Sequence, residues 1–170
     1  MKNFSEIERQ YSLMKFLPSK LGDLYIAPHN SERIIVRKFH NPQNIENFMA
    51  ITLAAKKWLT ENNFDDIVKV ADFIEAGEDY LIRRYYLYNT SLDEVQDEEK
   101  IPLSLMKLQS ALRSALEREL KSKSVIGEVL NKSLLGASTK TYFDGINNCL
   151  FVAEFRIDSS DLIGWRNSEN

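Results

Sequence analysis

The sequence predicts one α+β domain, in which an antiparallel sheet of two hairpins flanks a helix and is followed by another helix and a C-terminal β-hairpin. Short runs of β-branched and aromatic residues alternate with two long segments of helical periodicity. Turn residues separate the β runs in pairs. The 170 residues, 44% hydrophobic and 28% charged, suffice for one core and contain no linker, repeat or low-complexity segment. We therefore treat 1–170 as a single domain.

The first half of the chain predicts a helix, a hairpin and a second helix. Residues 1–16 are expected to be helical, because apolar side chains fall on one side and most charges on the other. Strands at 23–28 and 33–39 follow, with a turn at Asn30 and Ser31. Asn41-Pro42 predicts an N-cap and the first position of a helix that runs to about residue 60. Its apolar positions predict one buried stripe: Ile45, Phe48, Met49, Thr52, Ala55 and Leu59.

A second hairpin and another long helix come next. Strands at 67–74 and 79–87 are separated by Ala76-Gly77-Glu78, which predicts a tight turn. A helix is expected over 103–121, and residues 125–136 either extend it or form a separate helix. The predicted apolar stripe of the long helix is Leu105, Leu108, Leu112 and Ala115.

The C-terminal part predicts a hairpin and a frayed end. Residues 139–143 and 149–157 should pair across Asp144-Gly145. Strict alternation would place Glu154 and Arg156 on one face of the last strand. The opposite face would carry the apolar set that helix 103–121 should cover: Cys149, Phe151, Ala153, Phe155 and Ile157. Residues 159–170 are expected to be a frayed tail.

Composition narrows the classes of partner. The net charge of −3 disfavours nucleic acid and anionic membrane surfaces, and no apolar run is long enough for a membrane span. The single cysteine, Cys149, excludes an intramolecular disulfide and fits a reducing compartment such as the cytoplasm. The two histidines, His29 and His40, have no third ligand in the sequence, so we expect no metal and no cofactor.

Residues 20–95 resemble the small lobe and hinge of a protein kinase. The segment 22–27 is similar to the end of a glycine-rich loop and the strand after it, and 35–38 is similar to the strand that carries the phosphate-binding lysine. The helix at 42–60 stands where the regulatory helix of the family belongs. The resemblance implies that Lys38 matches that lysine, that Gly22 is a loop glycine, and that Glu154 stands at the metal-binding aspartate.

The residues that would perform kinase chemistry are mostly missing. Leu17 and Ser19 replace two of the three loop glycines, and the segment after helix 103–121 has no His-Arg-Asp sequence. The helix partner expected for Lys38 falls near Ala54 or Ala55, and neither has a carboxylate. The resemblance therefore predicts a degenerate, pseudokinase-like domain without phosphoryl transfer.

The resemblance to a kinase without its catalytic residues leaves two candidate functions for the protein. The first is a non-catalytic interaction or regulatory module, such as a chaperone or adaptor, that acts on a protein partner. Cations and aromatic residues gather on one strand and its continuation, and they are the expected contact residues: Arg83, Arg84, Tyr86 and Tyr88. The alternative is a small-ligand or nucleotide-binding protein with a cleft near Lys38, lined by Gly22 and Glu154. The sequence leaves the oligomeric state open.

Overall fold

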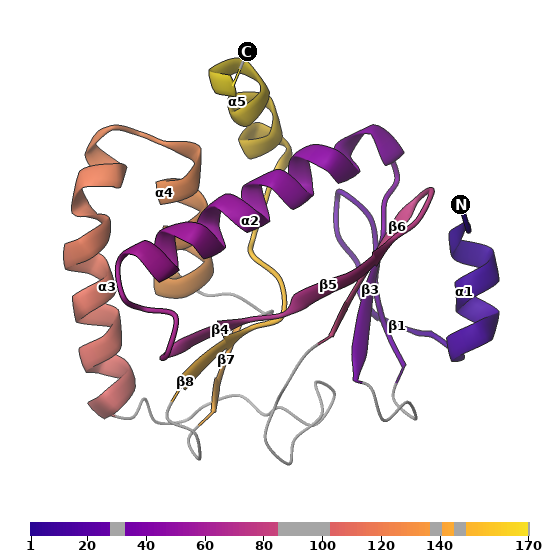
Figure 1. Cartoon of the computed structure of the whole chain (residues 1–170), viewed down its shortest axis with the longest axis horizontal. Helices are drawn as coiled ribbons and strands as arrows, with labels where there is room; N and C mark the ends of the chain where they lie inside the picture. Colours follow the sequence, from indigo (N-terminus) through magenta and orange to yellow (C-terminus); the bar gives the residue numbers. More distant parts are fainter. Residues whose placement is uncertain (28–32, 85–102, 137–140, 145–148, 170) are drawn as a thin grey trace.

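The computed structural model of the chain describes residues 1–27, 33–84, 103–136, 141–144 and 149–169. It has the predicted α+β architecture, with five antiparallel strands in one sheet and a second, three-stranded sheet. Helix α2 (Ile45–Glu61) crosses over both sheets, and α3 (Leu103–Lys121) lies beside the smaller one (Figure 1). Helix α1 (Phe4–Tyr11) lies at the opposite end (Figure 1).

The larger sheet contains the two hairpins that the first half of the sequence predicts. Its order is β1-β2-β3-β6-β5, every pair antiparallel. Gly77 makes the turn of the second hairpin, where its N–H donates to the carbonyl of Tyr80 at 2.9 Å. The predicted turn at Asn30 and Ser31 lies outside the described residues. The strands are β1 (Met14–Leu17), β2 (Leu24–Ile26), β3 (Ile34–Lys38), β5 (Asp72–Ala76) and β6 (Tyr80–Arg84).

The N-terminal helix is shorter than expected over 1–16. Asn3 and Glu6 form a capping box at the start of α1, and Ser12 ends it in a left-handed conformation with φ 52°. The chain then turns into β1, which pairs with β2. The residues after Ser12 therefore form hydrogen bonds with β2 at the edge of the sheet instead of continuing the helix.

Helix α2 begins and packs as its sequence predicts. The Asn41 side chain accepts a hydrogen bond from the Gln43 N–H at 3.1 Å, and a short 3₁₀ turn over Pro42–Asn44 leads into the helix. The predicted stripe is buried apart from the half-buried Met49. This helix covers the face of the sheet that carries the charged residues described below.

The predicted strand at 67–74 is instead two strands in two sheets. Strand β4 (Val68–Val70) pairs in parallel with β8 (Cys149–Val152), whereas β5 belongs to the larger sheet. Between them, the Ala71 N–H donates to the carbonyl of Val152 at 2.9 Å, which marks the change of partner. Strand β7 (Thr141–Asp144) completes the smaller sheet as the predicted hairpin partner of β8.

The helices of the second half include one that the sequence does not predict. Helix α3 has the expected bounds, and α4 (Val125–Leu130) is a separate helix capped by Ser124 and continued by a π-helical turn over Asn131–Leu135. The expectation of a frayed tail is wrong for 159–169, which form α5 (Ser159–Glu169). This helix is held at its start by Asp161, whose carboxylate accepts the N–H of Asp158 at 2.7 Å.

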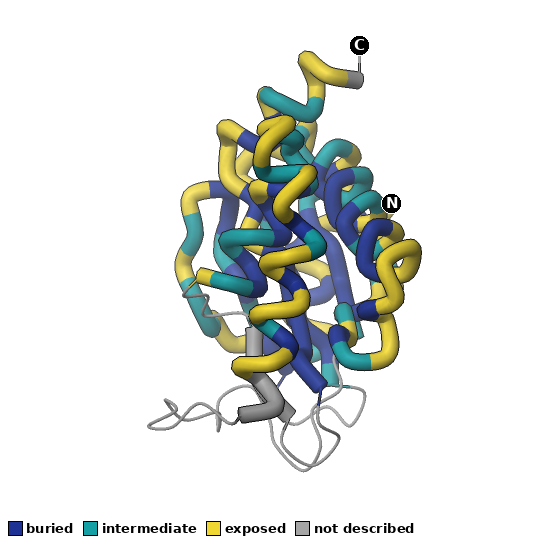
Figure 2. The backbone as a smooth tube through the Cα atoms, turned by 90° about the vertical axis from the view of Figure 1, so that its left-hand side faces the viewer, coloured by how far each residue is buried: buried dark blue, intermediate teal, exposed yellow. Residues whose placement is uncertain are grey.

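Strand β8 is buried on both faces, which corrects the predicted division between an apolar and a charged face. Leu150 and Val152 share a core cluster with Leu112 of α3, whereas Phe151 packs with residues of β2 and β3. Helix α3 therefore covers the opposite face from the one expected. The chain leaves the sheet after Val152, so the alternation stops there, and Glu154 is buried while Arg156 is exposed. Figure 2 shows the buried residues, in dark blue, along the strands inside the fold.

No helix in the described part of the chain is long and apolar enough to cross a membrane.

Candidate functional site

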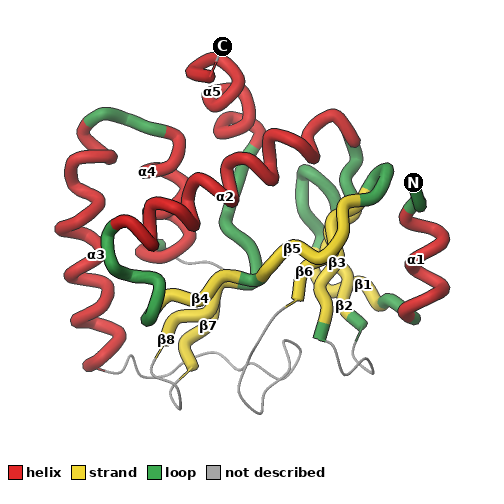
Figure 3. The backbone as a smooth tube through the Cα atoms, in the orientation of Figure 1, coloured by secondary structure: helices red, strands yellow, loops and turns green. Residues whose placement is uncertain are grey.

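The candidate site is a group of charged side chains buried between α2, the larger sheet and the loop that follows β8. Arg37 comes from β3, Arg83 from β6 and Glu154 from the loop, which passes behind α2 on its way to α5 (Figure 3). The three side chains are only 2–3% exposed. Charges at this depth are costly unless they are paired, so their contacts decide what the site can do.

Arg37 and Glu154 form a two-pronged ion pair. The Arg37 Nε donates to Glu154 Oε2 at 2.7 Å, and Nη2 donates to Oε1. The third prong, Nη1, donates to the carbonyl oxygen of Gly22 at 2.8 Å. The guanidinium thus uses its fork geometry on three acceptors at once.

Gly22 has a backbone that requires glycine. Its φ is +146°, and a Cβ there would lie 1.7 Å from the carbonyl oxygen of Lys38. This close approach brings the Gly22 carbonyl within reach of Arg37. The role of Gly22 in this conformation is therefore structural.

Arg83 is the second cation of the cluster and is only partly satisfied. Its Nη1 donates to the carbonyl of Ala153 at 3.2 Å and lies 3.7 Å from Glu154 Oε2. Its guanidinium carbon lies 5.2 Å from the ring centre of Phe48 and 4.6 Å from that of Phe73. Within the described residues, its buried Nε and Nη2 have no hydrogen-bond partner.

The electrostatics of the cluster follow from two cations and one anion. Burial lowers the pKa of Arg83 to about 10, the charge of Glu154 opposes that change, and the charge of Arg37 adds to it. At neutral pH the cluster carries a net charge of +1. Glu154 is already engaged by Arg37, so its carboxylate has little capacity left for a divalent cation.

Lys38 does not belong to this cluster. Successive residues of a strand point to opposite faces, so Lys38 faces α1 while Arg37 faces α2. The Lys38 ammonium lies 5.0 Å from the ring centre of Phe4. Of the three ligand-binding candidates, Gly22 and Glu154 meet through Arg37, and Lys38 lies on the other face of the sheet.

The four residues expected to contact a partner do not form one group in the structure. Arg83 is buried in the cluster, and Arg84 is half-buried at the end of β6. Tyr86 and Tyr88 lie outside the described residues. Of the two described residues of this set, Arg83 is therefore not available to a partner, and Arg84 is only partly exposed.

Sequence reasoning missed Arg37 and the two aromatic rings beside Arg83. The signal was one arginine at the end of the buried run Ile34–Arg37 and one glutamate inside the buried run Cys149–Phe155. A charged residue among buried apolar neighbours is typical of a buried ion pair.

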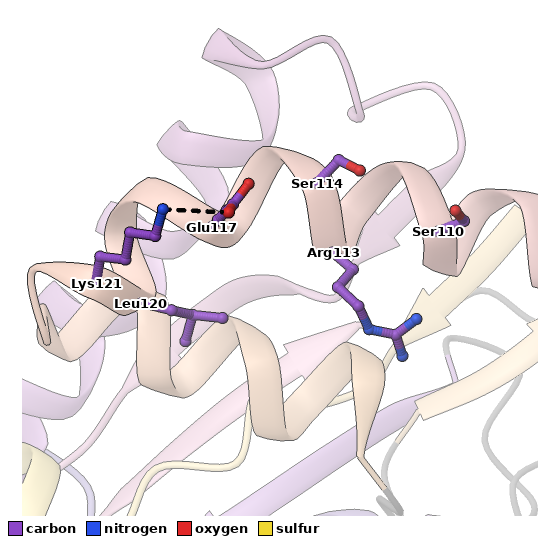
Figure 4. A pocket seen from close by; sticks show the side chains of 6 residues that line it. All are labelled: Ser110, Arg113, Ser114, Glu117, Leu120 and Lys121. Carbon is purple, nitrogen blue, oxygen red and sulfur yellow. Dashed lines mark ion pairs between the residues drawn. The ribbon is translucent and has the colours of Figure 1, made fainter.

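A second feature is an open pocket of about 540 Å³ over α3, and none of its lining residues belongs to the cluster (Figure 4). It is lined by Ser110, Arg113, Ser114, Glu117, Leu120 and Lys121.

The described residues contain no group of three or more His, Cys, Asp or Glu side chains arranged to hold a metal ion. No protein-family model matches the chain, and the search of curated proteins finds no significant match.

Proposed function

We propose that the chain is a non-catalytic interaction or regulatory module, a degenerate kinase-like domain that acts through a protein partner. The observation that supports this most is the ion pair of Arg37 and Glu154. Phosphoryl transfer depends on positioning and on neutralising developing charge, so the basic and acidic groups must be available to phosphate and metal. Here the inward cation of β3 and the acid at the metal-binding position neutralise each other inside the core.

The position of Lys38 supports the same reading. Its ammonium lies over Phe4 on the face covered by α1, whereas a phosphate-binding lysine has to reach the cleft that holds the nucleotide. A five-stranded sheet beside a helix over 42–60 is the arrangement that would support the resemblance, and the larger sheet with α2 across it has this form, with its first strand before residue 20. In the part of the chain that the structure describes, Lys38 and Glu154 are both engaged by other residues, which supports a function carried by contacts at the surface.

The test is an assay for phosphoryl transfer with radiolabelled ATP and magnesium or manganese, combined with thermal unfolding at millimolar nucleotide. We expect no transfer above background and no change in Tm, because a ligand stabilises only the state that it binds. The matched variants are Lys38→Ala and Lys57→Ala, the latter an exposed lysine of α2 outside the candidate loop.

Two results would overturn the proposal. Label transfer that Lys38→Ala abolishes and Lys57→Ala preserves would establish an enzyme. A nucleotide-dependent rise in Tm that only Lys38→Ala removes, without label transfer, would establish the alternative of a nucleotide-binding cleft near Lys38.

A further inference from the structure

The guanidinium of Arg83 has one edge that no group in the described part of the chain engages. We call its Nε and Nη2 the free edge of Arg83, because both atoms are buried and have no hydrogen-bond partner among the described residues. The remaining nitrogen, Nη1, donates to the carbonyl oxygen of Ala153 at 3.2 Å. Buried donors without an acceptor are rare and costly in folded proteins, so the free edge is a candidate binding site.

The position of Arg83 prevents this edge from turning toward solvent. Strand β6 lies between β3 and β5, and Arg83 stands opposite Ile35 on one side and Phe73 on the other. Its side chain is only 3% exposed. The guanidinium carbon lies 4.6 Å from the ring centre of Phe73 and 5.2 Å from that of Phe48. Two aromatic rings and an internal strand thus keep the guanidinium in the core, where electrostatic interactions are stronger than in water.

Arg37 shows what the same edge of a guanidinium binds in this core. Its Nε and Nη2 donate to the two carboxylate oxygens of Glu154, with Nε and Oε2 2.7 Å apart. The fork geometry of arginine lets such an edge place two N–H groups on one anion. The free edge of Arg83 offers the same pair of donors, whereas Glu154 approaches the other side of Arg83, 3.7 Å from its Nη1.

The charges of the cluster favour an anion over a water molecule at the free edge. Arg37, Arg83 and Glu154 add up to a charge of +1, and the charged groups that shift the pKa of Arg83 are these two neighbours. A buried net charge is costly unless it is compensated. A water molecule would accept the two N–H groups but leave the charge in place. One monovalent anion would satisfy the donors and also neutralise the cluster.

We propose that the free edge of Arg83 binds a small monovalent inorganic anion such as chloride. A divalent anion such as sulfate would leave the cluster with a negative net charge and would lose more hydration on entering the core. A nucleotide or a large organic acid does not suit an edge that is buried on all sides. The bound anion completes the charge balance that the ion pair of Arg37 and Glu154 leaves open, so the stability of the fold depends on chloride.

The experiment is thermal unfolding of the full chain in about 100 mM sodium chloride and in sodium gluconate of the same ionic strength. Gluconate is too large for a buried site. We expect the Tm of the unaltered protein to be about 3 °C or more higher in chloride, because a ligand stabilises the state that binds it. Arg83→Met removes the edge and should abolish this difference. Arg118→Met removes an exposed arginine of α3 and should preserve it.

Two further measurements separate the pair of donors from the positive charge. Arg83→Lys keeps the charge but not the two-donor edge, and we expect it to lose most of the chloride-dependent rise in Tm. Bromide in place of chloride should stabilise the unaltered protein in the same way. In a crystal grown with bromide, anomalous scattering should locate the ion at hydrogen-bond distance from Nε and Nη2 of Arg83.

The proposal fails if the unaltered protein has the same Tm in chloride and in gluconate, because a neutral water molecule would then suffice at the free edge. It also fails if Arg83→Met keeps the full difference, which would assign the ion to another place. A full difference in Arg83→Lys would show that charge alone attracts the ion. The inference goes beyond the proposed function and does not rest on it, since the phosphoryl-transfer assay and the chloride measurement can each fail alone.

Discussion

Arg37 and Glu154 are 117 positions apart in the chain and form the buried ion pair that ties β3 to the loop after β8. The pair also reaches Gly22 through the third prong of the guanidinium. It therefore joins the first hairpin, the C-terminal loop and, through Phe48, the helix α2. The balance of positive and negative charge in this cluster leads to predictions about the stability of the fold.

Removing the anion of the cluster should be strongly destabilising. Glu154→Gln keeps the shape of the side chain but leaves two buried cations uncompensated, at a cost of about 3–5 kcal/mol in the free energy of unfolding. Glu61→Gln removes a pair with Lys57 at 3.7 Å on the exposed side of α2 and should cost less than about 0.5 kcal/mol. Chemical denaturation measures both, and equal effects would contradict a buried role for Glu154.

Removing the second cation should have a much smaller effect. Arg83→Met deletes a charge with two unpartnered N–H groups and leaves Arg37 and Glu154 as a neutral pair. Met also keeps apolar contact with Phe48 and Phe73. We expect a change between about 1 kcal/mol of destabilisation and about 2 kcal/mol of stabilisation, whereas Arg37→Met should cost about 3 kcal/mol or more. A larger loss for Arg83→Met than for Arg37→Met would reverse the assigned roles.

Glycine at position 22 should be indispensable. Alanine there combines a φ of +146° with a Cβ 1.7 Å from the Lys38 carbonyl oxygen, so β2 and β3 have to move apart. Gly22→Ala should cost about 3 kcal/mol or more. Gly136→Ala is the control, because the nearest atom to its Cβ is 3.2 Å away, and we expect a cost below about 1 kcal/mol. Thermal unfolding that places both variants near the unaltered protein would show that the loop at Gly22 adapts.

Lys132 should make stability depend on alkaline pH. Burial by itself would lower the pKa of Lys132, but hydrogen bonds to Asp161 and Asp158 and their charges raise it above 10.5. A folded-state pKa above the unfolded value means that the stabilisation is complete below pH 10.5 and is lost as the pH rises through the folded-state pKa.

The comparison for this prediction is Lys132→Met. The unaltered protein should have the higher Tm at neutral pH, and the difference should disappear above pH 10.5 as the ammonium loses its proton. Because Arg83 and Tyr80 titrate in both proteins, the difference isolates Lys132. A Tm difference that stays constant from neutral to alkaline pH would show that the side chain stabilises by packing alone.

Local signals in the sequence determined much of the fold. Asn41-Pro42 predicted the start of the α2 region, Gly77 predicted a hairpin turn, and helical periodicity gave α3 its bounds over 103–121. Each depends on neighbours within a few positions, through caps, turn conformations or side-chain spacing. These elements can therefore be predicted from the local sequence alone.

The tertiary structure decided the rest. The sequence placed Glu154 on an outward face and matched Lys38 to a site, whereas the fold buries Glu154 on Arg37 and turns Lys38 toward Phe4. Ala71 divides one predicted strand because β8, far along the chain, offers a parallel partner to β4. The periodicity of a sequence does not show which distant strands will pair. Strand alternation fixes which residues share a face, but it does not fix which element packs on that face. The composition and local pattern thus determined the elements, and contacts across more than a hundred residues determined which charges meet.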